Sequence, residues 1–189
     1  MELPPTQQMT TAMLKAMAHP LRRRILAVFP RREFVRAADL AEELGEPANK
    51  ISFHLRVLAD AGLLVEAPEH ARDRRDRVWT GRRGALEIGA KGSPVDDPVL
   101  ADAVIAAYVD EHNDIMRRVL SRMPAYLAGV DVDPGSSFMR NRVKLTPERF
   151  DALLDTLAAA ILEAQAATAD DDPDARVYDI DILAADDGR

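Results

Sequence analysis

Apolar residues recur at helical spacing through the first third of the chain, with polar residues between them. The pattern predicts four successive helices, at about residues 6–18, 21–29, 37–44 and 47–61. Pro20 and Pro47 suit the first turn of a helix, and Gly45 and Gly62 suit the position after the last turn. The apolar run at 63–65 then predicts a short strand.

A hairpin is expected directly after these helices. The stretch EHARDRRDR, residues 69–77, predicts a charged loop, and RVWT predicts the returning strand. Two short helices around a tight Gly-containing turn, followed by a hairpin, indicate a winged helix-turn-helix, a unit that places one helix in the DNA major groove. Residues 81–98 contain Gly and Pro and predict a linker, with one more short strand at 86–88.

The second half of the chain predicts a mixture of helices and strands. A long helix is expected at 99–123, and Thr146-Pro147-Glu148 predicts the start of another, because it combines a hydroxyl cap, a first-turn proline and an acid. Residues 137–145 and 176–183 predict strands whose opposite charges favour pairing. The expected fold class is α+β and mostly helical: an N-terminal winged helix-turn-helix and a smaller C-terminal helix/strand domain.

The two halves differ in charge. The chain carries a net charge of −7, but residues 1–92 hold 16 Lys and Arg against 12 Asp and Glu, whereas residues 93–189 hold 9 against 20. A basic half joined to an acidic half is typical of a nucleic-acid reader attached to a module with another task. We therefore expect a DNA-binding domain at 1–92 and an acidic domain at 93–189 for dimerisation, effector binding or both.

Composition narrows the function further. Cysteine is absent, which excludes disulfides and thiolate chemistry. There is no secretory signal and no apolar run that could cross a bilayer, so a cytoplasmic protein with no membrane partner is expected. There is also no Gly-rich phosphate loop, nucleophile motif or convincing metal cluster. The expectation is a protein that is not an enzyme, with no catalytic residue, cofactor or metal site.

The outward face of the 47–61 helix supplies candidate DNA contacts, because Ile51, Leu55 and Leu58 form its buried stripe. Asn can pair with adenine, Arg with guanine or phosphate, and Lys and Ser with base edges or phosphates. The candidates are Asn49, Lys50, Ser52, Phe53, His54 and Arg56. An ordinary solvated polar face is the alternative.

Two of these positions have competing interpretations. Phe53 lies on the outward face, where it would press against thymine methyl groups, cover the base of the wing or contact a dimer mate. His54 borders the buried stripe and is expected to be a packing residue that, at most, donates to a phosphate.

The wing contributes four further candidates, Arg72, Arg74, Arg75 and Arg77. At a hairpin tip they are placed to reach a phosphate backbone or a neighbouring minor groove. The alternative is a solvated loop in which Asp73 and Asp76 neutralise half of the charge.

The order of these pieces resembles the ArsR-type winged helix-turn-helix repressors. MLKAMAHPLRRRILAVF, AADLAEELGEPANKISFHLRVLADAGLL and an Arg-rich hairpin ending in RVW cover about residues 9–80. SFHL at 52–55 and LADAGL at 58–63 match the family's Ser-x-His-Leu and Leu-x-x-Ala-Gly-Leu patterns. The resemblance implies a homodimer on a palindromic operator, with the 47–61 helix in the major groove, the wing arginines on the backbone and the first helix in the dimer interface.

The chain also departs from that family. Metal sensors of this type carry a Cys pair in the third helix, where this chain has Asp39-Leu40-Ala41-Glu42, so thiolate-based sensing is not expected. The C-terminal half extends beyond the minimal family domain. The sequence thus predicts a sequence-specific transcription regulator that binds double-stranded DNA. Most simply it is a dimeric repressor that leaves the DNA in response to an unidentified small-molecule effector or other signal. The alternative is a winged helix that contacts proteins and has no DNA sequence preference.

Overall fold

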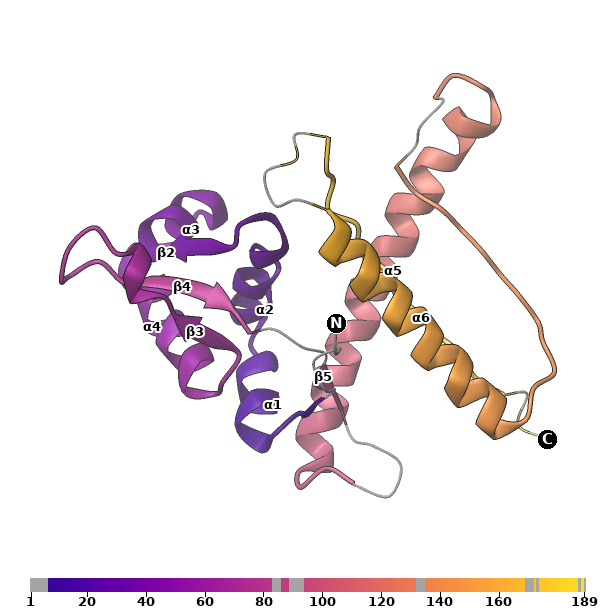
Figure 1. Cartoon of the computed structure of the whole chain (residues 1–189), viewed down its shortest axis with the longest axis horizontal. Helices are drawn as coiled ribbons and strands as arrows, with labels where there is room; N and C mark the ends of the chain where they lie inside the picture. Colours follow the sequence, from indigo (N-terminus) through magenta and orange to yellow (C-terminus); the bar gives the residue numbers. More distant parts are fainter. Residues whose placement is uncertain are drawn as a thin grey trace. The chain divides into compact units, whose positions relative to one another are not determined.

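The computed structural model describes residues 7–82, 86–88, 94–131, 135–168, 172, 174–186 and 188. Its elements are shown in Figure 1. In chain order they are β1 (Gln7–Gln8), α1 (Thr11–Met17), α2 (Pro20–Leu26), η1 (Phe29–Arg31), β2 (Phe34–Arg36), α3 (Ala37–Leu44), α4 (Ala48–Asp60), β3 (Leu64–Glu66), η2 (Pro68–His70), β4 (Val78–Gly81), β5 (Leu86–Glu87), α5 (Pro98–Leu127) and α6 (Pro147–Ala167). The expected α+β, mostly helical class is confirmed.

The chain forms two compact units, Met1–Ala107 and Tyr108–Arg189, so the boundary between them lies within α5. The first unit has a continuous apolar core to which α1, α2, α3, α4 and the small sheet all contribute. Its largest fully buried side chains are Leu14, Ile25, Leu40, Ile51, Leu55, Leu58, Val28, Val35, Val78 and Val104. This burial confirms the apolar stripe expected for α4 and fixes which face of that helix remains exposed.

The helix ends in this unit have local chemical causes. The Thr10 hydroxyl accepts a hydrogen bond from the Met13 amide at 3.2 Å, which begins α1. His19 Nδ1 accepts one from the Leu21 amide at 3.1 Å, which begins α2. Gly45 and Gly62 follow α3 and α4 with φ of +67° and +76°, a backbone conformation that side-chain-bearing residues rarely adopt. The helix stops predicted at these glycines are confirmed.

Two arginines of α2 hold the end of α1. Arg22 Nε donates to the Ala16 carbonyl at 2.5 Å, and its Nη2 donates to the Lys15 carbonyl at 2.6 Å. Arg23 Nη1 donates to the Met17 carbonyl at 2.7 Å. The last carbonyls of a helix have no partner within it, so these guanidinium groups satisfy them and fix the joint between the two helices.

The antiparallel sheet has the strand order β2-β4-β3, with Val35 opposite Trp79 and Val65 opposite Thr80. The β3–β4 hairpin confirms the predicted wing, and its loop extends well beyond the sheet in Figure 1. Strand β2 was not predicted, because three residues are too short to show alternation. Strand β5 confirms the short strand near residue 86, and it pairs in parallel with β1. That pairing places residues 7–8 in a strand, and the first helix begins at Thr11 rather than near Thr6.

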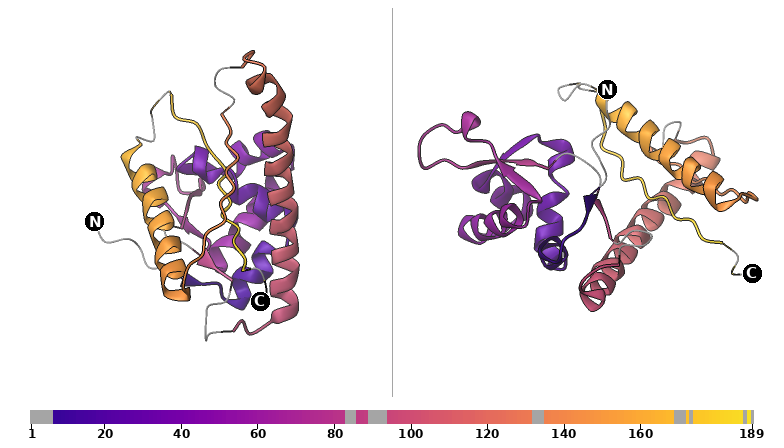
Figure 2. Two further views of the ribbon diagram at one scale, coloured as in Figure 1. Left: turned by 90° about the vertical axis from the view of Figure 1, so that its right-hand side faces the viewer. Right: turned by 60° about the horizontal axis from the view of Figure 1, so that its bottom comes forward.

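The second unit contains the C-terminal part of α5, the helix α6 and extended segments. The Thr146 hydroxyl accepts from the Arg149 amide at 3.4 Å, which confirms the predicted start of α6. The prediction of two paired strands was wrong: the described residues of 137–145 and 176–183 form no ladder. Instead, Asp179 accepts from Arg118 of α5 at 2.5 Å, and Asp181 lies 3.1 Å from His112 of the same helix. The aspartates that were expected to pair with a neighbouring strand therefore bond to helix α5. Figure 2 shows the C-terminal segment between α5 and α6.

Candidate nucleic-acid interface

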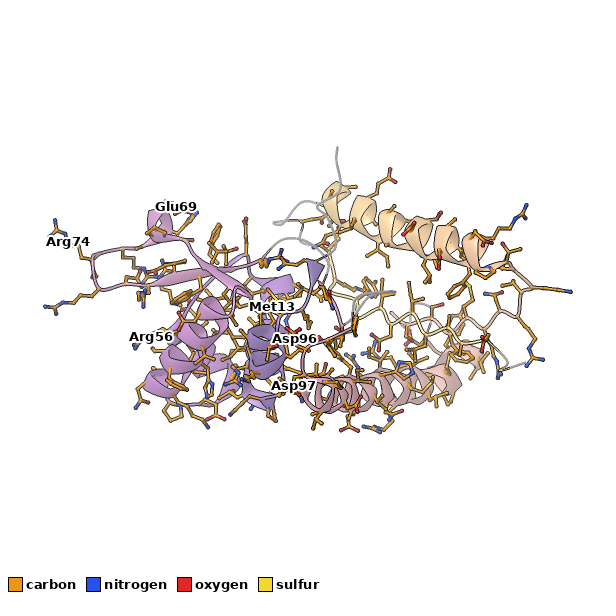
Figure 3. The ribbon with its side chains drawn as sticks, turned by 90° about the horizontal axis from the view of Figure 1, so that it is seen from below. Met13, Arg56, Glu69, Arg74, Asp96 and Asp97 are labelled. Carbon is orange, nitrogen blue, oxygen red and sulfur yellow. The ribbon has the colours of Figure 1, made fainter. Side chains whose placement is uncertain are left out.

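Helix α4 presents one polar face to solvent. Asn49, Lys50, Phe53 and Arg56 are exposed and Ser52 is half-buried, while Ile51, Leu55 and Leu58 are fully buried. Figure 3 shows Arg56 projecting from this helix. Five of the six residues proposed on α4 therefore lie on its solvent-facing side.

Hydrogen bonds within the protein determine which donors and acceptors on α4 remain free to bind a partner. Asn49 Oδ1 accepts from the Lys50 amide at 2.9 Å, whereas no hydrogen bond is seen from its amide group to a described residue. Ser52 Oγ donates to the Ala48 carbonyl at 2.8 Å and keeps its capacity to accept. Lys50 Nζ lies 2.8 Å from Glu46 Oε2, and this hydrogen bond lowers the pKa of Glu46. The Lys50 ammonium has three N–H donors, so the bond to Glu46 leaves it with further capacity to donate.

Phe53 remains 57% exposed, and its ring makes a T-shaped contact with that of His54, with 5.3 Å between the centroids. More than half of the side chain is therefore open to solvent. A large apolar side chain in the middle of a polar face is placed to contact a partner.

His54 does not share this exposed face. It is 5% exposed, its ring centroid lies 4.6 Å from that of His19, and its Nδ1 has no hydrogen-bond partner among the described residues. Burial, followed by the positive charges that His19, when protonated, and Arg22 would place nearby, lowers the pKa of His54. The packing interpretation is confirmed. The surface contact with DNA expected for His54 is not available to a ring in the core, because position 54 falls beside Ile51 and Leu58 on the inner side of the helix.

The acids of the wing loop hold its backbone. Asp73 Oδ1 accepts from the amides of Arg75 and Asp76 at 2.7 and 3.0 Å. Asp76 Oδ2 accepts from the Arg72 amide and from Arg36 Nε, both at 2.9 Å. The hydrogen bond from Arg36 is the main reason that the pKa of Asp76 is lowered. These carboxylates thus shape the loop through its backbone amides, and the positive charge of Arg72 also acts on Asp76.

The four wing arginines divide into two kinds. Arg77 donates to both oxygens of Glu66, at 2.9 and 2.7 Å, and its guanidinium lies 5.0 Å from the centre of the Trp79 ring. Arg72, Arg74 and Arg75 are exposed and form no ion pair with any residue the structure describes. Figure 3 shows Arg74 at the tip of the loop, pointing away from it. Arg72, Arg74 and Arg75 thus present their charges to solvent, whereas Arg77 stabilises the hairpin.

Sequence reasoning missed the residues that position this loop from outside it. Arg36 precedes α3, yet it bonds to Asp76 and donates to the His70 carbonyl at 2.8 Å. Forty residues separate Arg36 from Asp76, and no local pattern connects them. Only the unpredicted strand β2, which ends at Arg36 beside β4, brings the two together.

Comparison with protein families bears on this geometry. A family model described as a helix-turn-helix domain matches residues 17–67, from the end of α1 to just beyond β3. This chain carries a helix-turn-helix domain. Domains of this type occur in DNA-binding regulators, and α4 is the second helix of the motif. A search of curated proteins found no match.

Within the described parts of the chain, no group of three or more His, Asp or Glu side chains is arranged to hold a metal ion. None of the described helices is long and apolar enough to span a bilayer.

Proposed function

We propose that this protein is a sequence-specific transcription regulator of the ArsR type, most simply a repressor, that binds a palindromic operator as a homodimer. One observation carries the proposal: the helix-turn-helix places Asn49, Lys50 and Arg56 on the exposed face of α4, and the adjacent loop displays three arginines. Base-reading groups on a helix beside phosphate-binding groups on a wing are the two parts that specific recognition needs.

In this mode α4 enters the major groove. Asn49 offers its amide group to adenine, and Arg56 offers a fork of donors to guanine or phosphate. Ser52 accepts or donates at a base edge, and Phe53 contacts thymine methyl groups. Arg72, Arg74 and Arg75 neutralise backbone phosphates, whereas Arg77 keeps the hairpin in shape through Glu66.

A second function is favoured by Phe53 alone. A ring that is 57% exposed at the centre of the α4 face also suits a protein partner with an apolar pocket. Such a module would show no preference among DNA sequences and only a weak dependence on salt.

The test is fluorescence-anisotropy titration of the full chain with DNA from upstream of its own gene and with a scrambled duplex of equal length, at 50 and 200 mM salt. Specific regulation predicts tighter binding to the native fragment and a steep loss of affinity with salt, because phosphate contacts release counterions. Equal, weak and salt-insensitive binding to both duplexes would favour the protein-contact function. A selection of bound fragments from the whole genome then finds an operator that lies elsewhere.

A further inference from the structure

The contact between α2 and α4 contains two histidines, and neither is placed to carry a charge. His54 of α4 is 5% exposed, and its Nδ1 has no hydrogen-bond partner among the described residues. His19 directly precedes α2, and its Nδ1 caps that helix by accepting from the Leu21 amide at 3.1 Å. The two ring centroids lie 4.6 Å apart. A proton on His19 Nδ1 would remove the acceptor of the cap, and a proton on His54 would leave a charge in the core.

The charged groups that face this pair add to the cost of a proton on either ring. They are Arg22 and Arg23 of α2, Lys50 of α4 and Glu46 of the turn before α4. Glu46, the one anion of these four, is bonded to Lys50 at 2.8 Å and lies 3.7 Å from Arg24. Burial first, and then the nearby positive charges, lower the pKa of both histidines. The closed contact thus binds protons more weakly than two solvated rings would.

His54 also touches the solvent-facing side of α4 through its neighbour in the chain. Its ring makes a T-shaped contact with Phe53, which is 57% exposed. Lys50, another candidate DNA contact, lies one turn before His54 on the same helix. A movement of α4 away from α2 would therefore displace both candidates. Paired hydrogen bonds to base edges need a strict geometry, whereas attraction between a cation and a phosphate tolerates displacement.

We infer that the proton is the signal that releases this protein from its operator: protonation of His19 and His54 opens the contact between α2 and α4, and α4 then loses its preference among DNA sequences. The inference rests on the proposed function and assigns the releasing signal that this function requires. A ligand shifts an equilibrium between two conformations only by its difference in affinity for them. The proton has such a difference, because the rings bind it more tightly once they are solvated. In this mechanism His19 and His54 are positioning residues that do not touch DNA.

The first test is anisotropy titration of the full chain with its preferred DNA fragment and with a scrambled duplex, at pH 7.5 and 5.5 and at constant salt. Affinity for the preferred fragment should fall at least ~10-fold at pH 5.5, within the limit of about tenfold per pH unit for each proton taken up. Binding to the scrambled duplex should hold or tighten, because acid makes the chain less negative. Trp79 is the sole tryptophan and is 4% exposed, so native emission at pH 5.5 shows that the first unit is still folded. Loss of that emission would replace local opening by unfolding and overturn the inference.

Two substitutions remove the titrating groups but keep what each ring provides. His54→Phe retains an aromatic ring against Phe53, and His19→Asn retains a side-chain acceptor for the first turn of α2. Each should reduce the ratio of the affinities at the two pH values, and the double variant should abolish it. Ile51→Val is the matched control, because it removes one methyl group from the buried side of α4 and no titratable group, so its ratio should match the wild type. A ratio that survives both histidine changes would overturn the inference.

A second measurement needs no DNA. After correction for the intrinsic rate at each pH, the Leu21 amide should exchange with deuterium faster at pH 5.5 than at 7.5, whereas the Leu58 amide within α4 should not. Unchanged protection of Leu21 would overturn the opening itself. Faster exchange at Leu21 together with an undiminished DNA preference would overturn its link to release. A chain without DNA preference at pH 7.5 would overturn the proposed function and the release together, and Leu21 exchange would then decide the opening separately.

Discussion

The imidazole rings of His19 and His54 lie 4.6 Å apart between centroids, at an angle of 49°, where the start of α2 meets the inner side of α4. His19 uses its Nδ1 as an acceptor for the Leu21 amide, so its neutral form is the one that caps α2. His54 is buried beside it. This contact joins the two helices, and the cap that His19 makes on α2 requires its neutral ring.

Acid is therefore expected to destabilise the first unit. Burial is the largest cause lowering the pKa of both His19 and His54 below their ordinary value of 6.5. The unfolded chain then takes up protons at a higher pH than the folded chain does. Stability is full above pH 6.5 and falls as the pH drops from there toward the lower folded pKa. Urea unfolding followed by Trp79 emission at pH 7.5 and 5.5 measures the difference.

A variant locates the source of that acid sensitivity. His54→Leu should reduce the stability difference between the two pH values. The groups that face His54 are His19, Arg22, Lys50 and Glu46. An unchanged pH dependence in His54→Leu would assign the effect to another group.

The wing arginines should differ in their contribution to the salt dependence of DNA binding. Arg74→Ala and Arg75→Ala are each expected to reduce the slope of log K against log salt by about 0.9, the value for one phosphate contact. Arg77→Ala is the matched control, because its guanidinium is bonded to Glu66. Its slope should stay near that of the wild type. Equal slopes for all three variants would mean that the loop does not distinguish these arginines.

The α4 face should carry base preference. Asn49→Ala and Arg56→Ala are each expected to cost about 1–3 kcal/mol in binding to the preferred site and much less on scrambled DNA. Asp60→Ala, at the other end of α4, controls for the loss of a polar side chain and should retain the preference. The quantity to compare is the ratio of the two dissociation constants. A ratio that survives the combined Asn49→Ala and Arg56→Ala changes would remove α4 from the recognition model.

Removal of Arg36 should loosen the wing without touching its arginine side chains. Arg36 is bonded to Asp76 and to the His70 carbonyl, and Asp76 in turn accepts from the Arg72 amide. In Arg36→Ala the Arg72 amide is expected to exchange with deuterium faster, while amides in α3 exchange as before. Arg32→Ala, which loses an exposed pairing to Glu43, is the control. Unaltered exchange at Arg72 would show that the loop folds independently of Arg36.

Gly62 should be costly to replace. Its φ of +76° is strained for any residue with a side chain, although an added Cβ would meet only Met13 Cε at 3.5 Å. Gly62→Ala is expected to lower the free energy of unfolding by about 1–2 kcal/mol. Asn tolerates this conformation better, so Gly62→Asn should cost less. Denaturant unfolding measures both, and equal costs would point to the Met13 contact instead of the backbone.

The sequence predicted the helices of the first unit because each had a local stop or start, such as Gly45 or Pro20. It predicted the hairpin from a charged loop between short apolar runs. It could not predict β2, whose three residues become a strand only through pairing with β4. For the same reason it could not foresee that Arg36 supports the wing.

The second unit shows the opposite error. Alternation at 176–183 is a real pattern, but its acidic positions bond to Arg118 and His112 of a helix instead of facing a strand. Alternation establishes that successive side chains face opposite ways; it does not identify what lies on either side. In α4, helical spacing correctly predicted that Ile51 is buried and Asn49 exposed. His54 differs from the other candidate contact residues of α4, because its ring lies in the core.

The run LRRRIL in α2 would count as part of a DNA-facing charge if basic residues were simply summed. Arg22 and Arg23 point instead to carbonyl groups at the end of α1, and Arg24 Nη2 donates to the Leu44 carbonyl of α3 at 2.9 Å. These three arginines therefore connect neighbouring helices through backbone carbonyl groups, and Arg24 does so while it remains exposed. A change of the DNA preference of α4 can therefore leave those three arginines in place. Neutralising them in order to reduce nonspecific DNA binding would instead loosen the packing of α1, α2 and α3.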